Sequence, residues 1–166
     1  DFKNLKWPMP HTHKNVELLS QTTVQSINLG EKVVSMSNKV SHHIVDLKYD
    51  FLVLAPGVAT DWDAIPGMAE HVLDYAEFEH TKTLADLIFN IQVGVISVVI
   101  CGKSFKCPPA PFELCCLLAE LMRARGVRDR VKVRFICQAD RSRLQETFFE
   151  RFTERGIEVV TDCKPV

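Results

Sequence analysis

The second half of the chain alternates strand patterns with helix patterns, and this alternation restricts the fold more than any other feature of the sequence. Apolar runs typical of buried strands cover residues 93–101, 131–137 and 157–161. Helical spacing of apolar side chains covers residues 81–91, 111–125 and 143–155. Strands that alternate with helices of this length pair in parallel and carry the helices on their faces. We therefore predict an α/β fold with a parallel sheet.

The first half of the chain has a different pattern. Runs rich in β-branched residues at 22–29, 32–36 and 40–47 predict three short strands joined by turns, which would form a small antiparallel β-meander. Residues 49–54 are apolar on both faces, and this predicts a further strand buried inside a larger sheet. Residues 58–75 read as connecting chain.

Composition and charge exclude several classes of protein. With 46% hydrophobic residues, 25% charged residues and a formal net charge of −1, the chain lacks the clustered basic surface of a nucleic-acid-binding protein. No apolar run reaches the roughly 18–20 residues of a membrane-spanning helix. The chain begins at Asp1 without a Met and ends just beyond an apparent strand. We expect it to be a fragment of a longer protein.

The loop between the first buried strand of the second half and the following helix carries the chemistry. Ligands and catalytic groups gather at this strand-to-helix edge of an open α/β sheet. A dinucleotide site would need a GxGxxG turn here, but the segment GKSFKCPPAPFE has only Gly102. Its prolines, Pro108, Pro109 and Pro111, remove backbone N–H donors and stiffen the loop. We infer that nicotinamide-dinucleotide binding at this loop is weak or absent.

Cys107 lies directly before the helix pattern, between two lysines and two prolines. A helix N-terminus stabilises a nearby anion by about 0.3–1 kcal/mol, and neighbouring Lys103 and Lys106 add positive charge. Such a setting favours the thiolate, which is the reactive form. Two interpretations stay open on position alone: a reactive thiol and an inert buried one. For Cys115, Cys116 and Cys137, which lie inside helix and strand patterns, packing is the better interpretation.

Two other groups of polar residues stand out, and neither predicts a site. Four histidines have no cysteine or carboxylate partner at metal-ligand spacing, so we expect no metal site there: His11, His13, His42 and His43. Four arginines at the end of the 111–125 helix pattern and just beyond it read as a solvated face: Arg123, Arg125, Arg128 and Arg130.

Two blocks of the sequence resemble a known family. YDFLVLAPGVATDWDAIPG, Tyr49 to Gly67, is similar to a segment shared by many FAD-dependent pyridine nucleotide-disulfide oxidoreductases. CPPAPFE, Cys107 to Glu113, resembles the more specific cysteine loop of the sulfide:quinone oxidoreductases and of the flavoprotein subunit of flavocytochrome c sulfide dehydrogenase. The resemblance covers nearly all of this chain but only the central part of such an enzyme.

The resemblance implies a Rossmann-like FAD/NAD(P)-binding fold with a parallel sheet, helices and a small antiparallel β-meander. Residues 1–75 would form the C-terminal part of an FAD-binding domain, with the meander and a return strand. Residues 76–166 would form a degenerate, truncated NAD(P)-type βαβ domain. The FAD-phosphate turn that opens such enzymes, and the second redox cysteine in their C-terminal part, have no counterpart in this sequence.

The resemblance also implies roles for individual residues. Cys107 matches the redox cysteine, Ala55, Pro56 and Gly57 match a turn that passes close to FAD, and Val24 matches a strand residue whose backbone contacts the adenine. Some quinone-reducing members have a further cysteine after the Pro-Gly turn, where this chain reads MAEHVL. This departure leans toward the flavocytochrome-like pattern. Phe112 stands where the family often has Tyr.

The implied function is sulfide oxidation through a redox cysteine and FAD, with electrons passed to quinone or cytochrome c. We expect the fragment alone to be inactive and not to hold FAD. The substrate would be sulfide or another small sulfur compound, with no nucleic-acid partner and with peripheral membrane association through regions absent here. A cytoplasmic or membrane-peripheral location is favoured over a periplasmic one. The alternatives are an FAD-dependent NADH dehydrogenase-like enzyme and a non-catalytic domain that kept the fold.

Overall fold

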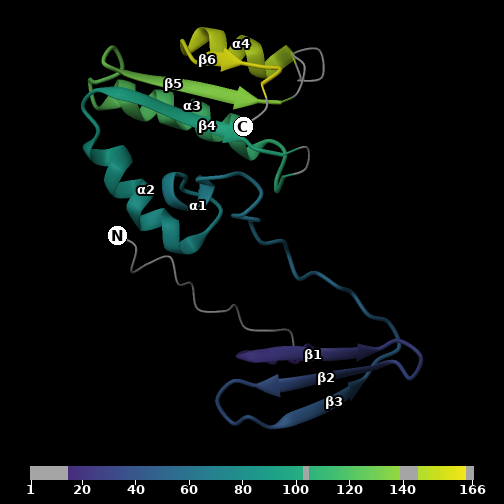
Figure 1. Ribbon diagram of the computed structural model, residues 1–166. Helices are drawn as coiled ribbons and strands as arrows, with labels where there is room; N and C mark the ends of the chain where they lie inside the picture. The colour runs from purple at the N-terminus through teal and green to yellow at the C-terminus, as the bar shows by residue number, and fades with distance from the viewer. Residues whose placement is uncertain (1–14, 103–104, 139–145, 164–166) are drawn as a thin grey trace. The chain divides into compact units, whose positions relative to one another are not determined.

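The computed structural model describes residues 15–102, 105–138 and 146–163 (Figure 1). The chain forms two compact units, Asp1–Gly57 and Val58–Val166. The division between an FAD-type and an NAD(P)-type portion, which the sequence analysis placed at residue 75, concerns parts of a larger protein. That division stays a prediction.

The first unit is the predicted β-meander. Its strands are β1 (Thr22–Asn28), β2 (Val33–Asn38) and β3 (Ile44–Lys48), which pair antiparallel in the order β1-β2-β3. At the β1–β2 turn, the Asn28 side chain accepts a hydrogen bond of 3.0 Å from the Glu31 amide. Val34 and Met36 of the central strand are buried, while β3 is exposed along its whole length.

The prediction of a buried strand over residues 49–54 is wrong for this chain. The structure has no strand there, and Phe51 and Val53 are 95% and 87% exposed. A run that is apolar on both faces needs neighbouring strands and covering layers, and the described part of the chain provides neither. The apolar pattern therefore indicates that the segment is able to form a buried strand, but it does not show whether a neighbouring strand is present.

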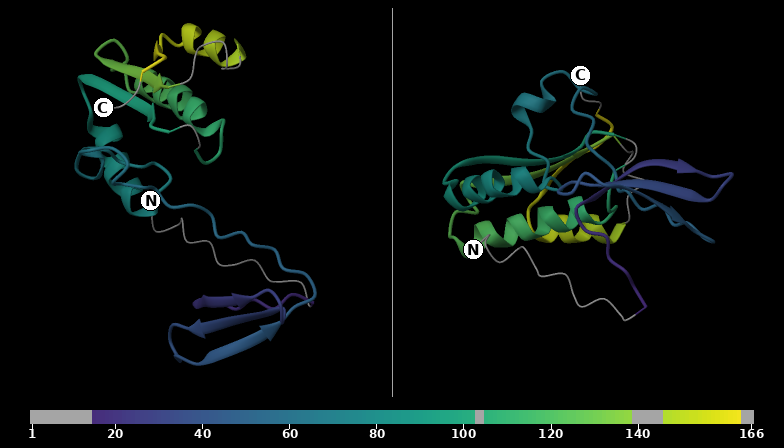
Figure 2. Two further views of the ribbon diagram at one scale, coloured as in Figure 1. Left: turned by 45° about the vertical axis from the view of Figure 1, so that its right-hand side comes forward. Right: turned by 90° about the horizontal axis from the view of Figure 1, so that it is seen from below.

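The second unit contains the predicted parallel sheet. Its strands are β4 (Gly94–Ile100), β5 (Val131–Cys137) and β6 (Glu158–Val160), in the order β4-β5-β6. Its helices are α1 (Met68–His71), α2 (Phe78–Asn90), α3 (Ala110–Ala124) and α4 (Glu146–Glu154). α3 contacts β4 and β5, and α4 contacts α3 and β6 (Figure 2). The α/β fold is confirmed, and only the short α1 falls where plain connecting chain was expected.

A cluster of phenylalanines forms the core between α3, α4 and β5. Phe135 and Phe152 are almost fully buried, and their ring centroids lie 5.4 Å apart. Phe112, from the first turn of α3, lies 4.8 Å from Phe135 and stacks on Phe148 at 4.4 Å. Each such aromatic pair contributes about 0.5–1.5 kcal/mol beyond the burial of area. The start of α3 is therefore held firmly, and with it the end of the loop that carries Cys107.

The predicted solvated face of arginines is wrong for two of its four members. Arg125 donates to the carbonyls of Ile88 (2.6 Å) and Ile91 (2.8 Å), and so ties the end of α3 to the end of α2. Arg128 donates to the carbonyls of Val131, Arg155 and Gly156. Helix ends leave carbonyls without partners, and a guanidinium with its five donors can satisfy several of them at once. Charge periodicity alone cannot show such contacts, because the carbonyls come from distant segments.

None of the helices in the described ranges is long and apolar enough to cross a membrane.

Candidate functional site

Cys107 lies in the connection between β4 and α3, at the carboxyl end of the parallel sheet. It is exposed, and its carbonyl accepts a hydrogen bond of 2.9 Å from the Ala110 amide, which closes the turn before the helix. Its φ of +48° is in the left-handed region. A residue with a Cβ pays about 1–2 kcal/mol for this conformation. Such strain is found most often at functional sites.

The first turn of α3 has no free backbone donor. The amides of Phe112 and Glu113 both donate to the Pro109 carbonyl, at 3.1 and 3.0 Å. The Ala110 amide is already engaged by the preceding turn, and Pro111 has no N–H at all. A helix N-terminus binds phosphate through amides that point at the ligand. This helix start therefore cannot hold a pyrophosphate in the way a glycine-rich loop does.

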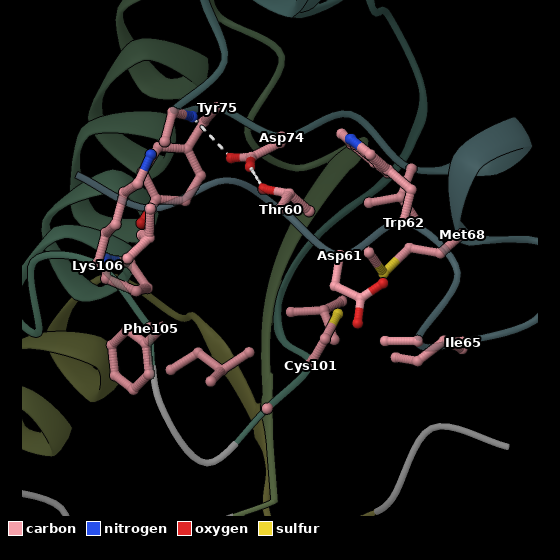
Figure 3. Close-up of a pocket in the computed structure, with 18 of the residues that line it drawn as sticks. Thr60, Asp61, Trp62, Ile65, Met68, Asp74, Tyr75, Cys101, Phe105 and Lys106 are labelled. Atoms are coloured by element: carbon pink, nitrogen blue, oxygen red, sulfur yellow. Dashed lines mark hydrogen bonds between the residues drawn. The ribbon is translucent and has the colours of Figure 1, made fainter. Parts of the chain in front are cut away.

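A cavity of about 550 Å³ lies beside the Cys107 loop, within the second unit (Figure 3). One wall comes from the connecting segment that runs between residues 58 and 76, and the other from the end of β4 and the loop that follows it. Lys106 and Pro111, on either side of Cys107 in the sequence, both line the cavity. A cavity at the carboxyl edge of a parallel sheet is where α/β proteins place their ligands.

The carboxylate of Asp74 organises the connecting wall of the cavity. It accepts hydrogen bonds from the Thr60 hydroxyl and, at 2.8 Å, from the Ala76 amide. The Asp74 amide donates to Nδ1 of His80 at 3.0 Å. His80 in turn meets the Trp62 ring edge-on, with centroids 5.1 Å apart. The segment is thus fixed by contacts that are local in the chain.

Three groups at or near the cavity are held in their protonated forms. Burial and, to a smaller extent, the Asp74 carboxylate raise the pKa of the Cys101 thiol. Burial also raises the pKa of Tyr75, and the negative charges of Asp74, Cys107 and Cys115 raise it further. Burial raises the pKa of the Cys115 thiol to about 12. Cys101 and Tyr75 line the cavity and can act as hydrogen-bond donors there.

Cys115, Cys116 and Cys137 have the packing roles that the sequence predicted. Cys115 and Cys137 are buried, and Cys116 packs against the same core while staying partly exposed. Cys163 lies beyond β6 and is partly exposed. Cys107 therefore differs from the thiols of the core in being exposed.

The other residues that the resemblance implicated lie in the first unit. Val24 is in β1, 52% exposed, paired with Met36 beside a register shift in the strand. Ala55, Pro56 and Gly57 are exposed, and Gly57 has a φ of +74°. An exposed backbone can be approached by a cofactor, but these four residues build no cradle for a phosphate or a ring. Their contact with FAD stays a prediction.

Two of the four histidines named in the sequence analysis lie in the described residues. His42 and His43 are exposed, and His11 and His13 lie outside the described residues. Within the described ranges, no group of three or more histidine, cysteine or acidic side chains could hold a metal ion.

The sequence analysis missed the cavity and the residues of its connecting wall. Thr60, Asp74 and Tyr75 fall in a segment that has no periodicity and matches no motif. The only signal was the presence of several polar residues inside an otherwise apolar connection.

No protein-family model matches the chain. Among curated proteins, the mitochondrial sulfide:quinone oxidoreductase of Dictyostelium discoideum is 24% identical over 96 residues, which are 54% of this chain and 21% of the relative. The chain thus spans about a fifth of the curated relative that it matches.

Solved structures share the fold. The sulfide:quinone oxidoreductase of Aquifex aeolicus matches with a TM-score of 0.61 and 22% identity, over 86% of this chain and 35% of its own. The NAD-dependent persulfide reductase of A. fulgidus matches with a TM-score of 0.60 and 22% identity, over 90% of this chain and 26% of its own. The water-forming NADH oxidase of Lactobacillus brevis matches with a TM-score of 0.51 and 16% identity, over 85% of this chain and 30% of its own. These comparisons confirm the Rossmann-like fold and the resemblance that the sequence carries.

Proposed function

We propose that this chain, which has the fold of the dinucleotide-binding oxidoreductases it resembles, is the central part of a flavin-dependent enzyme that oxidises sulfide through Cys107. The observation that carries the proposal is the setting of Cys107. It is an exposed thiol on a strained left-handed backbone, beside a cavity, at the edge of the sheet where related folds bind ligands. The similarity to two sulfide:quinone oxidoreductases supports the sulfur chemistry.

The step assigned to Cys107 is a thiol–disulfide exchange. Hydrosulfide attacks the Cys107 sulfur of a disulfide that Cys107 shares with a second cysteine, supplied from outside this chain. The disulfide bond breaks, a persulfide forms on Cys107, and the second cysteine leaves as a thiolate. Exposure of Cys107 gives the small anion access to the sulfur. Lys106, which is also exposed, places a positive charge beside its path.

FAD would supply the acceptor of the electron pair and pass it to quinone or cytochrome c. Val24 and the turn at Ala55 to Gly57 are the residues of this chain proposed to contact the flavin nucleotide. The described residues build no phosphate cradle, so the remaining contacts would come from other parts of the enzyme. Association with a membrane surface would come from those parts as well.

An NADH dehydrogenase of the same fold is supported less well. Two of the similar structures are named for NADH or NAD, and dinucleotide binding in this fold uses amides at the helix start after the first strand. In this chain those amides are bonded internally or replaced by proline. Bleaching of the flavin by NADH in the complete enzyme would overturn this preference.

The first experiment measures iodoacetamide labelling of each cysteine against pH, with the sites read by peptide mass spectrometry. We expect Cys107 to be labelled first, at a pH where Cys115 and Cys137 are untouched, because the latter two are buried. Labelling of Cys107 no faster than that of Cys115 would contradict the redox role and favour a non-catalytic domain. In the complete enzyme, C107S should abolish sulfide-dependent quinone or cytochrome reduction, while C163S should retain it.

A further inference from the structure

The second unit has another hollow, a groove of about 920 Å³ along the free edge of its sheet. The strand order β4-β5-β6 makes β4 an edge strand, and among the described residues it pairs with β5 alone (Figure 1). Five consecutive residues of β4, residues 95–99, line this edge groove. Successive side chains of a strand point to opposite faces, so a consecutive run places the groove beside the unpaired backbone groups of the strand edge.

Apolar side chains from two helices form the walls of the edge groove. α2 with its C-cap and α3 contribute six of them: Leu84, Leu87, Ile88, Ile91, Leu114 and Leu118. Asp86 is the only carboxylate and His71 the only basic side chain among the described residues that line it. Unpaired backbone groups between apolar walls fit an extended peptide, which supplies main-chain hydrogen bonds together with apolar side chains. The groove is therefore suited to a further strand.

Residues 49–54, with the sequence YDFLVL, are a segment of this kind. Phe51, Val53 and Leu54 are exposed, and the structure has no strand there. In an extended conformation Phe51 and Val53 would point to one face, and Leu52 and Leu54 to the other. A contiguous exposed apolar run marks an interaction site, and one that is apolar on both faces needs apolar neighbours on both.

The edge of β4 provides apolar neighbours on both faces. Val95 and Val99 lie on one face of the strand, and Ile96 and Val98 lie on the other. A strand added at this edge would meet these side chains as cross-strand neighbours. The lengths agree as well, because six extended residues span about 20 Å and the seven residues of β4 span about 23 Å. The chain thus contains an unpaired strand edge and an unpaired strand-forming segment that complement each other.

We propose that residues 49–54 of one molecule add as a strand to the free edge of β4 in a second copy of this chain. Each copy both provides a segment and offers a groove, so two copies can make the same contact twice in a closed dimer. The added strand pairs with the backbone of β4 and removes Phe51 and Val53 from water. This inference is independent of the proposed function, because it involves neither Cys107 nor a cofactor.

The test follows the sedimentation of the full chain across the micromolar range. Wild type should form dimers as the concentration rises, whereas V53K in the segment and L87K in the groove should each remain monomeric. Both positions are exposed, so these substitutions leave the fold of each copy intact. Each should weaken association by at least about a hundredfold, because the dimer would then bury an unpaired ammonium twice.

Two variants match these substitutions outside the proposed contact. V40K changes an exposed valine in the turn between β2 and β3, and F89K changes an exposed residue of α2 that does not line the groove. Both should dimerise as wild type does. Loss of the dimer in these controls as well would overturn the proposed contact, since it would show that any added charge prevents association.

A mixture of V53K and L87K tests the exchange of segments directly. V53K keeps an intact groove and L87K keeps an intact segment, so a mixed pair can form one of the two contacts. With one variant fluorescently labelled, the mixture should associate at concentrations where neither variant associates alone. A wild-type chain that stays monomeric, a dimer that survives both substitutions, or a mixture without association would each overturn the inference.

Discussion

Cys107 and Cys115 show how environment decides the behaviour of two chemically identical side chains. Cys107 precedes α3 and is exposed, whereas Cys115 lies within α3 and has no exposed surface. An exposed thiol beside positive charge can ionise and react, while a buried one behaves as a small apolar group. The reactivity proposed for this protein therefore depends on where the helix begins.

Burial of Cys115 predicts a loss of stability at high pH. Its pKa is raised to about 12 in the folded chain but is about 8.5 in an unfolded one. Between these values the unfolded state has lost the proton and the folded state has kept it. The free energy of unfolding should therefore fall by about 1.4 kcal/mol per pH unit through this thiol, while its full contribution is present below pH 8 or so.

Urea unfolding followed across this alkaline range tests the sign of the effect. C115A should show a flatter dependence of stability on pH than wild type, whatever its absolute stability. C163A, at a partly exposed site, should keep the wild-type slope. Parallel slopes for wild type and C115A would contradict the assignment.

The helices and strands of the second unit were largely predictable from the sequence, because their apolar patterns report burial directly. The strand over Val131–Cys137 was predicted with its observed bounds. The failure at residues 49–54 has a physical cause: apolar spacing does not say whether a partner strand is present. The cavity could not be predicted either, because the segment around Tyr75 and the end of β4 meet only in the folded chain.

The contacts of Arg125 predict that this residue holds two helix ends together. R125M removes both hydrogen bonds to the carbonyls of Ile88 and Ile91 while it keeps most of the side-chain bulk. We expect a loss of about 1–3 kcal/mol in the free energy of unfolding, because partly buried carbonyls lose a charged donor. Urea unfolding gives this value.

R123M is the matched control at the same helix end. Arg123 is exposed, and among the described residues its side chain pairs only with Glu120 on the helix surface, so its loss should change stability by less than about 1 kcal/mol. Equal effects of the two substitutions would show that the carbonyl contacts of Arg125 add nothing.

At the scale of the whole molecule, the two units differ in how much core they contain. Among the described residues of the first unit, only Val34 and Met36 are buried apolar side chains, whereas the second unit has a continuous core around Phe135. A three-stranded sheet with little covered surface is at the limit of independent stability. The two units should therefore behave differently when each is made alone.

We expect residues 58–166 to unfold cooperatively in urea when they are expressed alone, with Cys115 protected from alkylation until the transition. Residues 1–57 alone should show no cooperative transition, because the apolar surface they bury is too small to offset the loss of chain entropy. Circular dichroism against urea distinguishes the two cases. A cooperative transition in the isolated residues 1–57 would contradict this view.

The left-handed backbone at Cys107 has an evolutionary consequence. Glycine adopts a φ of +48° without the penalty that any side chain incurs there, so C107G should raise the free energy of unfolding by about 1 kcal/mol while it removes the thiol. In a lineage that no longer needs the sulfur chemistry, substitution of Cys107 by glycine would be favoured because it stabilises the fold. The reactivity that we propose for Cys107 therefore opposes the conformational preference of the backbone, which favours glycine at this position.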